Sequence, residues 1–268
     1  MCASILQADK ALGMSINAAM PLNMQELSAV GITCIEVTWR AANMLSDSAL
    51  AQCDRIIRDA ERCGIRVWSL HLPYGDDWDP SSVDDVVRDN AISGLIRLID
   101  FACDRNIHTL VIHPSFEPIA VEAREERLRL ASLSLGILAR HAAERGARLA
   151  AECLPRTCLA HSADEMLMLL ADNPELWVCA DVNHLFHETP GDFIRKIGDK
   201  IITTHISDND ANDEQHWYPG EGTIDWQDTL SALQEVGYDG PIMYEVRNHT
   251  AERVYTNWRS IHISKGDE

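Results

Sequence analysis

The sequence contains no long apolar run and no block of positive charge. The 268-residue chain carries 23 lysines and arginines against 42 aspartates and glutamates, a formal net charge of −19. Such a charge repels nucleic-acid phosphates and anionic membranes, which argues against both as partners. The first ten residues lack the basic start and apolar core of a signal peptide, and no run is long enough to span a membrane.

The eight cysteines form no C-x-x-C pair and no tightly spaced group. The sequence therefore shows neither a zinc-finger nor a dithiol redox pattern, and we expect reduced cysteines in a cytoplasmic protein. It also lacks a P-loop and a G-x-G-x-x-G fingerprint, so no nucleotide site is predicted.

Short β-like runs alternate with longer amphipathic helical segments along the whole chain. The expected strands are residues 13–17, 34–39, 66–72, 109–114, 148–154, 176–182, 201–207 and 241–246. Glycines that stop helices follow several of the helical segments, and no linker interrupts the pattern. Eight such units predict an α/β fold, a single (β/α)8 TIM barrel over residues 1–268, with an open parallel sheet as the alternative.

Charged or imidazole side chains end seven of these eight runs. They are Glu36, His71, His113, Glu152, Asp181, His205 and Glu245. Strands of a parallel sheet are normally apolar throughout, because helices cover both faces. Polar residues at their C-terminal ends converge on the mouth of a barrel, where active sites of this fold lie.

Four of these residues predict a site for a divalent metal ion: Glu152, Asp181, His205 and Glu245. Three carboxylates and one imidazole favour Mn²⁺, Mg²⁺ or Co²⁺ over a closed structural zinc site. Carboxylates that meet in a cavity repel one another unless a cation compensates their charge. The alternative is that arginines neutralise them, and Arg156, Arg195 or Arg247 could do so.

Other polar and aromatic side chains are candidates for substrate binding. They are His71, His113, His184, His216, Glu214, Trp39 and Trp78. His184 follows Asp181 by three residues and could orient it or hold a substrate hydroxyl. Aromatic faces beside polar groups suit sugars, although loop packing explains a tryptophan equally well. The turn-rich residues 73–82 could form a lid over the mouth.

The motifs HLP, IHP, AEC, ADVNH, HISDND, EQHWYPGEGTIDW and GYDGPIMYEV resemble those of the xylose isomerase-like TIM-barrel superfamily. Within it the chain is similar to the sugar phosphate isomerase/epimerase family, which includes the ketose 3-epimerases. The resemblance implies that Glu152, Asp181, His205 and Glu245 bind one ion, Mn²⁺ first and Mg²⁺, Co²⁺ or Zn²⁺ next. It also implies that Glu152 and Glu245 exchange the substrate proton through a metal-bound enediolate.

The resemblance implies a sugar isomerase or epimerase acting on a ketose, keto-sugar or polyol-derived ketone. Inosose dehydratases and keto-sugar lyases use similar barrels, so a lyase is the alternative. The abasic-site endonucleases of the endonuclease IV type bind three zinc ions. Their metal-ligand pattern has counterparts at nine positions of this chain, one of which is Glu214, where those enzymes have aspartate. A non-catalytic carbohydrate-binding barrel has no need of two proton-transfer glutamates. By analogy with the family, we expect a homo-oligomer, a dimer or a tetramer.

Overall fold

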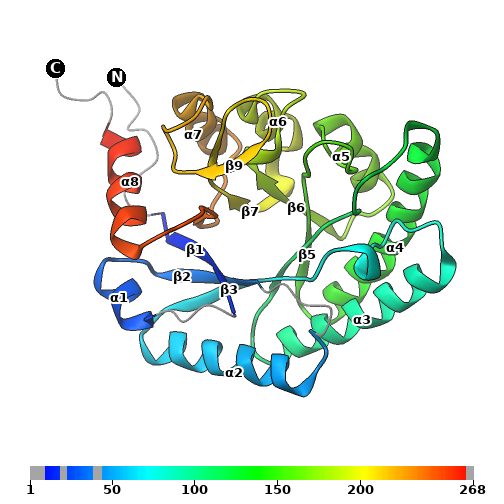
Figure 1. The fold of residues 1–268 in the computed structure, drawn as a ribbon, viewed down its shortest axis with the longest axis horizontal. Coiled ribbons are helices and arrows are strands. Elements are labelled where there is room, and N and C mark those ends of the chain that lie inside the picture. Colours follow the sequence, from blue (N-terminus) through cyan, green and yellow to red (C-terminus); the bar gives the residue numbers. More distant parts are fainter. Residues whose placement is uncertain (1–9, 19–22, 39–43, 264–268) are drawn as a thin grey trace.

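The barrel is visible in the structure, a computed structural model that describes residues 10–18, 23–38 and 44–263 (Figure 1). Its strands are β1 (Leu12–Asn17), β2 (Cys34–Thr38), β3 (Arg66–His71), β4 (Thr109–Ile112), β5 (Arg148–Glu152), β6 (Leu176–Asp181), β7 (Ile201–His205) and β10 (Ile242–Tyr244). Strands that follow one another are paired in parallel, and β10 pairs with β1. A bridge between Ile206 and Tyr244 joins β7 to β10, which confirms the predicted (β/α)8 fold.

Helices surround the strands in the order that the sequence predicts. They are α1 (Met24–Ala29), α2 (Asp47–Arg62), α3 (Asp85–Cys103), α4 (Arg124–Glu144), α5 (Ala163–Ala171), α6 (Pro190–Ile197), α7 (Trp226–Glu235) and α8 (Ala251–Ile263). Short 3₁₀ turns are η1 (Asp76–Trp78), η2 (Val121–Ala123), η3 (Val182–His184) and η4 (Gly198–Lys200). Within the described ranges, no helix is both long and apolar enough to cross a bilayer.

The core lies between the strands and the inner faces of the helices. Leu95, Leu98 and Ile99 of α3 are fully buried, and their spacing of three and four residues places them on one side of the helix. Gly64 follows the C-terminus of α2, and Gly146 follows that of α4. Their φ values are 70° and 73°, a conformation that glycine adopts without strain. The pattern of apolar residues therefore fixes which face of each helix covers the barrel.

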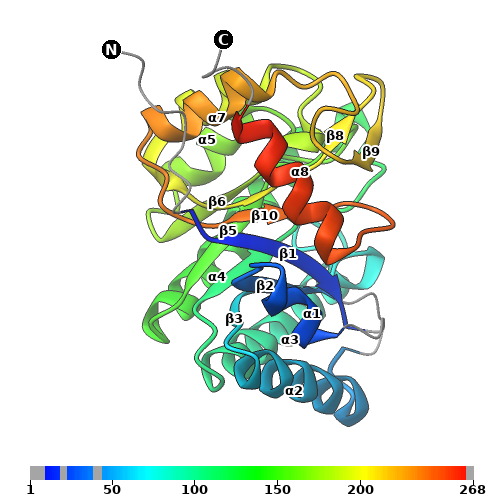
Figure 2. The same cartoon turned by 90° about the vertical axis from the view of Figure 1, so that its left-hand side faces the viewer.

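Helix α8 crosses in front of β1 and β10 in the view of Figure 2. Its Val254 and Trp258 are buried. Asn257 accepts a hydrogen bond of 2.8 Å from the Tyr244 hydroxyl of β10 and donates one of 2.9 Å to the carbonyl of Pro219. The last helix thus holds the final barrel strand and the loop after β9 together.

A two-stranded ribbon, β8 (Asp208–Asn209) with β9 (Glu214–Trp217), stands between β7 and α7. The buried Asp208 carboxylate anchors it. Its Oδ2 accepts hydrogen bonds from Gly220 N and Trp226 Nε1, both at 2.8 Å, and its Oδ1 accepts from Asn209 N and Ile224 N at 3.0 and 3.1 Å. Gly222 passes so close that a Cβ there would lie 2.1 Å from the carbonyl oxygen of Asn209. These contacts fix the segment that carries Glu214 and His216.

We expect Asp208→Ala to lower the free energy of unfolding by about 3 kcal/mol, because it leaves buried N–H donors without an acceptor. Chemical denaturation monitored by circular dichroism measures this loss. The matched control is Asn212→Ala, an exposed residue of the same segment, which should change stability by less than about 0.5 kcal/mol. Equal stability of the Asp208 variant and the control would show that this carboxylate does not anchor the ribbon.

Candidate metal centre and active site

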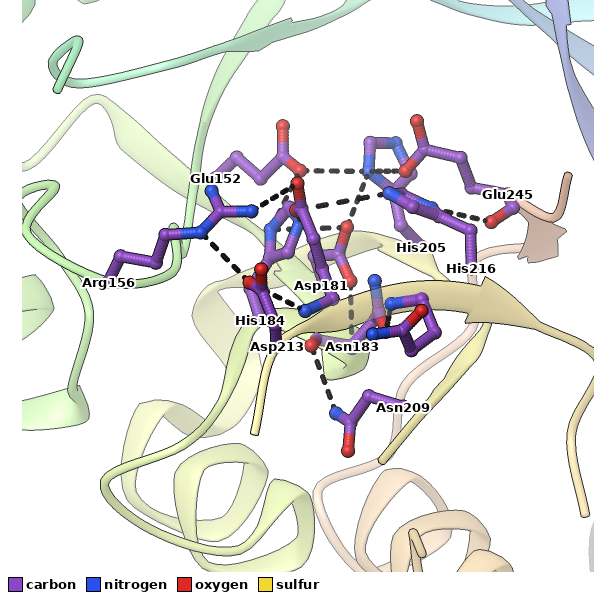
Figure 3. A network of polar contacts seen from close by, with 12 residues as sticks. Glu152, Arg156, Asp181, Asn183, His184, His205, Asn209, Asp213, His216 and Glu245 are labelled. Carbon is purple, nitrogen blue, oxygen red and sulfur yellow. Dashed lines mark hydrogen bonds and ion pairs between the residues drawn. The ribbon is translucent and has the colours of Figure 1, made fainter. Parts of the chain in front are cut away.

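Four side chains converge on one point at the C-terminal mouth of the barrel (Figure 3). Glu152, Asp181 and His205 end β5, β6 and β7, and Glu245 follows β10. The His205 Nδ1 atom lies 3.1 Å from Glu152 Oε1, 3.2 Å from Glu245 Oε2 and 3.5 Å from Asp181 Oδ2. One donor atom from each residue lies within 4.8 Å of the other three. The register of the parallel strands brings their ends to a common level, as the sequence pattern predicts.

The donor set fits a divalent cation. Glu152, Asp181 and His205 are buried, and Asp181 Oδ2 has no hydrogen-bond partner. An unsatisfied buried carboxylate oxygen is costly unless a positive charge compensates it. Three carboxylate oxygens and one imidazole nitrogen are the hard, oxygen-rich ligands that Mn²⁺ and Mg²⁺ favour.

Arginines do not neutralise these carboxylates. Arg156 Nη1 lies 2.8 Å from Glu117 Oε1, and its Nε and Nη2 lie 2.9 and 2.8 Å from carboxylate oxygens of Asp213 and Glu214. Arg195 pairs with Asp228 and Glu235. In the described part of the chain, no lysine or arginine forms an ion pair with Glu152, Asp181 or Glu245. The alternative of arginine neutralisation therefore fails for the described residues.

Two imidazoles hold the second oxygen of Glu152. His71 Nε2 and His113 Nε2 lie 3.0 and 3.1 Å from Glu152 Oε2. Burial raises the pKa of Glu152, but the nearby His205 and His113 hold it well below its ordinary value. Burial raises the pKa of Glu245, and the neighbouring histidines do not fully offset this effect. In the metal-free protein the pKa values of the two glutamates are therefore shifted in opposite directions.

The other two candidate histidines, His184 and His216, also contact residues at the mouth. His184 Nδ1 lies 3.0 Å from the carbonyl oxygen of Cys153 and 3.3 Å from Asp181 Oδ2, and its Nε2 lies 2.7 Å from Glu214 Oε2. His216 Nδ1 donates to the carbonyl oxygen of Glu245 at 3.0 Å. His184 therefore lies beside a predicted metal ligand, Asp181, while its hydrogen bonds go to the Cys153 carbonyl and to Glu214 of the β8–β9 ribbon.

Arg156 connects three loops around the mouth. Its partners are 39, 57 and 58 residues away along the chain, in the loop after β4 and in the β8–β9 ribbon. The backbone of Arg156 has φ of 53°, an uncommon value for a residue with a side chain. The guanidinium therefore fixes the wall of the site, a role that its local sequence does not reveal.

A cavity of about 740 Å³ lies over the cluster. Trp78 lines it but also packs on α3, where a Cβ at Gly94 would lie 2.7 Å from the indole ring. Trp39 lies outside the described residues. Tyr74, which the sequence reasoning missed, lines the cavity with its ring stacked on His113, the centroids 4.1 Å apart. Its place in the turn-rich segment after β3 was the only signal available in the sequence.

The buried histidines predict how the stability of the metal-free protein depends on pH. Burial lowers the pKa of His71, but its contact with Glu152 raises it to about 9. For His184 burial likewise lowers the pKa, and Asp181 and Glu214 raise it to about 10. Because the folded state raises these values above the ordinary pKa, the stabilisation is complete below pH about 6.5 and is lost as the pH rises through about 9 to 10.

We therefore expect Tm of the chelated protein to fall between pH 7 and pH 10 by about 5 °C or more. Calorimetry at a series of pH values measures this change, with His71→Gln as a variant in which part of the fall is removed. Protein loaded with Mn²⁺ is the second comparison, because a cation replaces protons as the source of positive charge. A chelated protein with the same Tm at both pH values would contradict the assignment of charged histidines.

Comparison with known proteins identifies the family. The protein-family model described as "Xylose isomerase-like TIM barrel" matches residues 24–261. The protein belongs to this family. A relative from Methanocaldococcus jannaschii, "Uncharacterized protein MJ1311", is 28% identical over 188 residues. That match covers 67% of this chain and 64% of the relative, less than two thirds of the relative's own length.

Several solved structures superimpose over almost the whole chain. A D-tagatose 3-epimerase-like protein has a TM-score of 0.81 and 22% identity, covering 94% of this chain and 97% of its own. The 3-keto-D-glucoside 4-epimerase YcjR from E. coli has a TM-score of 0.74 and 17% identity, covering 94% of this chain and 99% of its own. Further neighbours include D-psicose and L-ribulose 3-epimerases. The neighbours named here are sugar epimerases or an epimerase-like protein, and at these identities the likeness shows a shared fold.

Proposed function

We propose that this protein is a divalent-metal-dependent isomerase or epimerase acting on an unphosphorylated ketose, keto-sugar or polyol-derived ketone. The observation that carries the proposal is the convergence of Glu152, Asp181, His205 and Glu245 without a neutralising arginine among the described residues. Two of these carboxylates, Glu152 and Glu245, lie on opposite sides of His205 in the view of Figure 3. This arrangement suits proton transfer on either side of one substrate carbon.

Glu152, Asp181, His205 and Glu245 would hold the cation, with Mn²⁺ first among the candidates and Mg²⁺, Co²⁺ and Zn²⁺ after it. A bound cation would supply Lewis-acid stabilisation of negative charge on substrate oxygens. One glutamate accepts the proton from the carbon beside the carbonyl group, and the other returns a proton. His71 and His113 keep the Glu152 carboxylate in place, while His184, His216 and Glu214 can hydrogen-bond substrate hydroxyls, and Tyr74 and Trp78 offer aromatic faces to the sugar.

The test is solvent-deuterium exchange into a panel of ketoses, keto-glycosides and inososes, with Mn²⁺-loaded protein in D₂O and NMR detection. We expect deuterium at the carbon beside the carbonyl group of at least one compound, together with its epimer or isomer. A product that has lost its β-substituent would instead identify the lyase or dehydratase alternative, which begins with the same proton abstraction. A metal-loaded protein that exchanges no proton in any compound would contradict the proposal.

A second candidate, a zinc-dependent abasic-site endonuclease, is favoured by one observation. Besides the four-residue cluster, two more groups could each hold a metal ion: His71, His113 and Glu152, and His184, Glu214 and His216. The net charge of −19 and the exposed acids Asp76 and Asp77 at the mouth oppose DNA binding. Metal content by plasma mass spectrometry separates the candidates, since one ion per chain suits the sugar enzyme and three zinc ions suit the nuclease.

Two further expectations stay predictions. The chain of residues 1–268 is expected to form a single domain, and the protein is expected to be a cytoplasmic homodimer or homotetramer. Limited proteolysis tests the first, and light scattering tests the oligomeric state.

A further inference from the structure

A fourth carboxylate, Glu36 of β2, lies deeper in the barrel than the predicted metal ligands. It stands two residues before the end of β2, where its strand neighbours in register are Ser15 of β1 and Ser69 of β3. Its side chain is fully buried. An ionised carboxylate at such a position is strongly destabilising unless donors and positive charge surround it.

Three groups from three strands contact the Glu36 carboxylate. The Ser15 hydroxyl donates to Oε1 at 3.1 Å, the Ser69 hydroxyl donates to Oε2 at 2.8 Å, and His205 Nε2 lies 2.9 Å from Oε1. Among the described residues, the only ion pair of Glu36 is this one with His205. The barrel interior therefore pairs this buried acid with one specific imidazole.

The contact decides which nitrogen of His205 can bind a cation. A carboxylate accepts hydrogen bonds only, so the Nε2 atom that faces Glu36 must carry a proton. In the metal-free protein Nδ1 also faces carboxylates, since it lies within 3.5 Å of Glu152, Glu245 and Asp181 oxygens. A cation bound among these oxygens would take the place of the Nδ1 proton, while Nε2 keeps its proton against Glu36. The His71 ring stacks on His205 with centroids 5.7 Å apart and an interplanar angle of 15°, which limits rotation of the imidazole.

We propose that Glu36 is a positioning residue that orients His205 as an Nδ1 ligand by holding a proton on Nε2. This inference rests on the proposed metal site but assigns a residue outside it. Glu36 acts through His205 and touches neither the cation nor the substrate. Partners that accept the second N–H of a metal-binding histidine fix its tautomer and raise its basicity, and their loss commonly weakens metal binding 10- to 100-fold.

The first measurement is the Kd for Mn²⁺ by isothermal titration calorimetry of chelated wild-type, Glu36→Gln, Glu36→Asp and Ser69→Ala proteins. We expect Glu36→Gln to weaken binding about 10- to 100-fold, because an amide is a weaker acceptor and lacks the charge. Glu36→Asp keeps the charge but withdraws it from Nε2, so it should also weaken binding. Ser69→Ala removes a donor from the other oxygen of Glu36 and should change Kd by less than about three-fold.

The second measurement, NMR of the His205 Nε2–H proton in the metal-free protein, does not depend on metal binding. The wild-type protein should show a downfield, slowly exchanging Nε2–H signal, which shifts or disappears in Glu36→Gln and persists in Ser69→Ala. A structural role alone would lower Tm of the Glu36 variants and leave both the Kd and this signal unchanged. If Glu36→Gln does not fold, Glu36→Asp provides the same two readouts.

The outcomes separate this inference from the proposed function. Wild-type Mn²⁺ affinity in folded Glu36→Gln and Glu36→Asp proteins would overturn the role of Glu36 and leave the metal site in place. A wild-type protein that binds no divalent cation would contradict the proposed metal-dependent function, and with it this inference, whatever the NMR signal shows.

Discussion

Glu245→Gln should reduce turnover by about 10³-fold or more, because an amide cannot accept or return the proton at the substrate carbon. The effect on folding should be small. Glu245 is 28% exposed at its side chain, the amide has nearly the same volume, and among the described residues His205 is the only ion-pair partner of the carboxylate. The measurement is the rate of deuterium exchange, on the compound that the panel identifies, with Tm recorded on the same sample.

Glu117→Gln is the matched control for this variant. Glu117 also lines the cavity with its side chain 28% exposed, but it pairs with Arg156 at the rim instead of the metal cluster. We expect the control to keep turnover within about ten-fold of the wild-type value, since it weakens one of the three carboxylate contacts of Arg156 and a hydrogen bond from Thr157 and leaves the metal cluster unchanged. Full exchange activity in folded Glu245→Gln protein would remove the central claim about proton transfer. Glu152→Gln should lose turnover as well, with an added loss of stability because His71 and His113 contact its carboxylate.

Removal of the metal should abolish turnover of the wild-type protein, and readdition of Mn²⁺ should restore it. The physical reason is the cluster of buried acidic oxygens, whose mutual repulsion and unsatisfied Asp181 Oδ2 demand a cation. We expect the restored activity to saturate at about one ion per chain, and a free Mn²⁺ concentration of 100 Kd to stabilise the fold by about 2.7 kcal/mol. Activity assays after dialysis against a chelator, with thermal unfolding in parallel, make this measurement.

His205→Ala tests the requirement for a metal ion by removing a ligand instead of the ion. The variant removes the one imidazole of the donor set and should weaken Mn²⁺ binding by at least about 100-fold, with turnover lost at ordinary metal concentrations. The control is His141→Ala on α4, where the imidazole lies 3.0 Å from Asp100 on the outside of the barrel. Its Kd for Mn²⁺ should equal that of the wild-type protein. Unchanged activity of thoroughly chelated wild-type protein would show that the reaction needs no metal.

The positions of the strands and the convergence of their last residues could be read from the sequence. Apolar runs of five to seven residues between amphipathic segments are a local pattern, and β5, β6 and β7 end at Glu152, Asp181 and His205 as the pattern predicts. In a parallel barrel the strand ends must meet at one mouth, so local order was enough to bring these side chains together. Their chemical roles stay predictions until the variants are measured.

Glu36 shows where local pattern was insufficient. The pattern groups it with the acids at the strand ends, yet the expected run 34–39 and β2 itself both continue past it, through Val37 and Thr38, so the carboxylate lies beneath the mouth. The depth of a side chain in a barrel depends on the register between strands, which neighbouring residues in the sequence do not encode. The same holds for Arg156, whose partners in the chain lie 39 to 58 residues away.

The sequence by itself determined the barrel, the four residues that meet at its mouth and the acidic charge that opposes nucleic-acid binding. These features follow from periodicity and composition, which are properties of short segments and of the whole chain. Only the tertiary structure decided that no arginine among the described residues neutralises the cluster, that Asp208 anchors the β8–β9 ribbon and that Glu36 faces His205. Each of these depends on contacts between distant segments, because a charge or a hydrogen-bond donor acquires its partner only when the barrel closes.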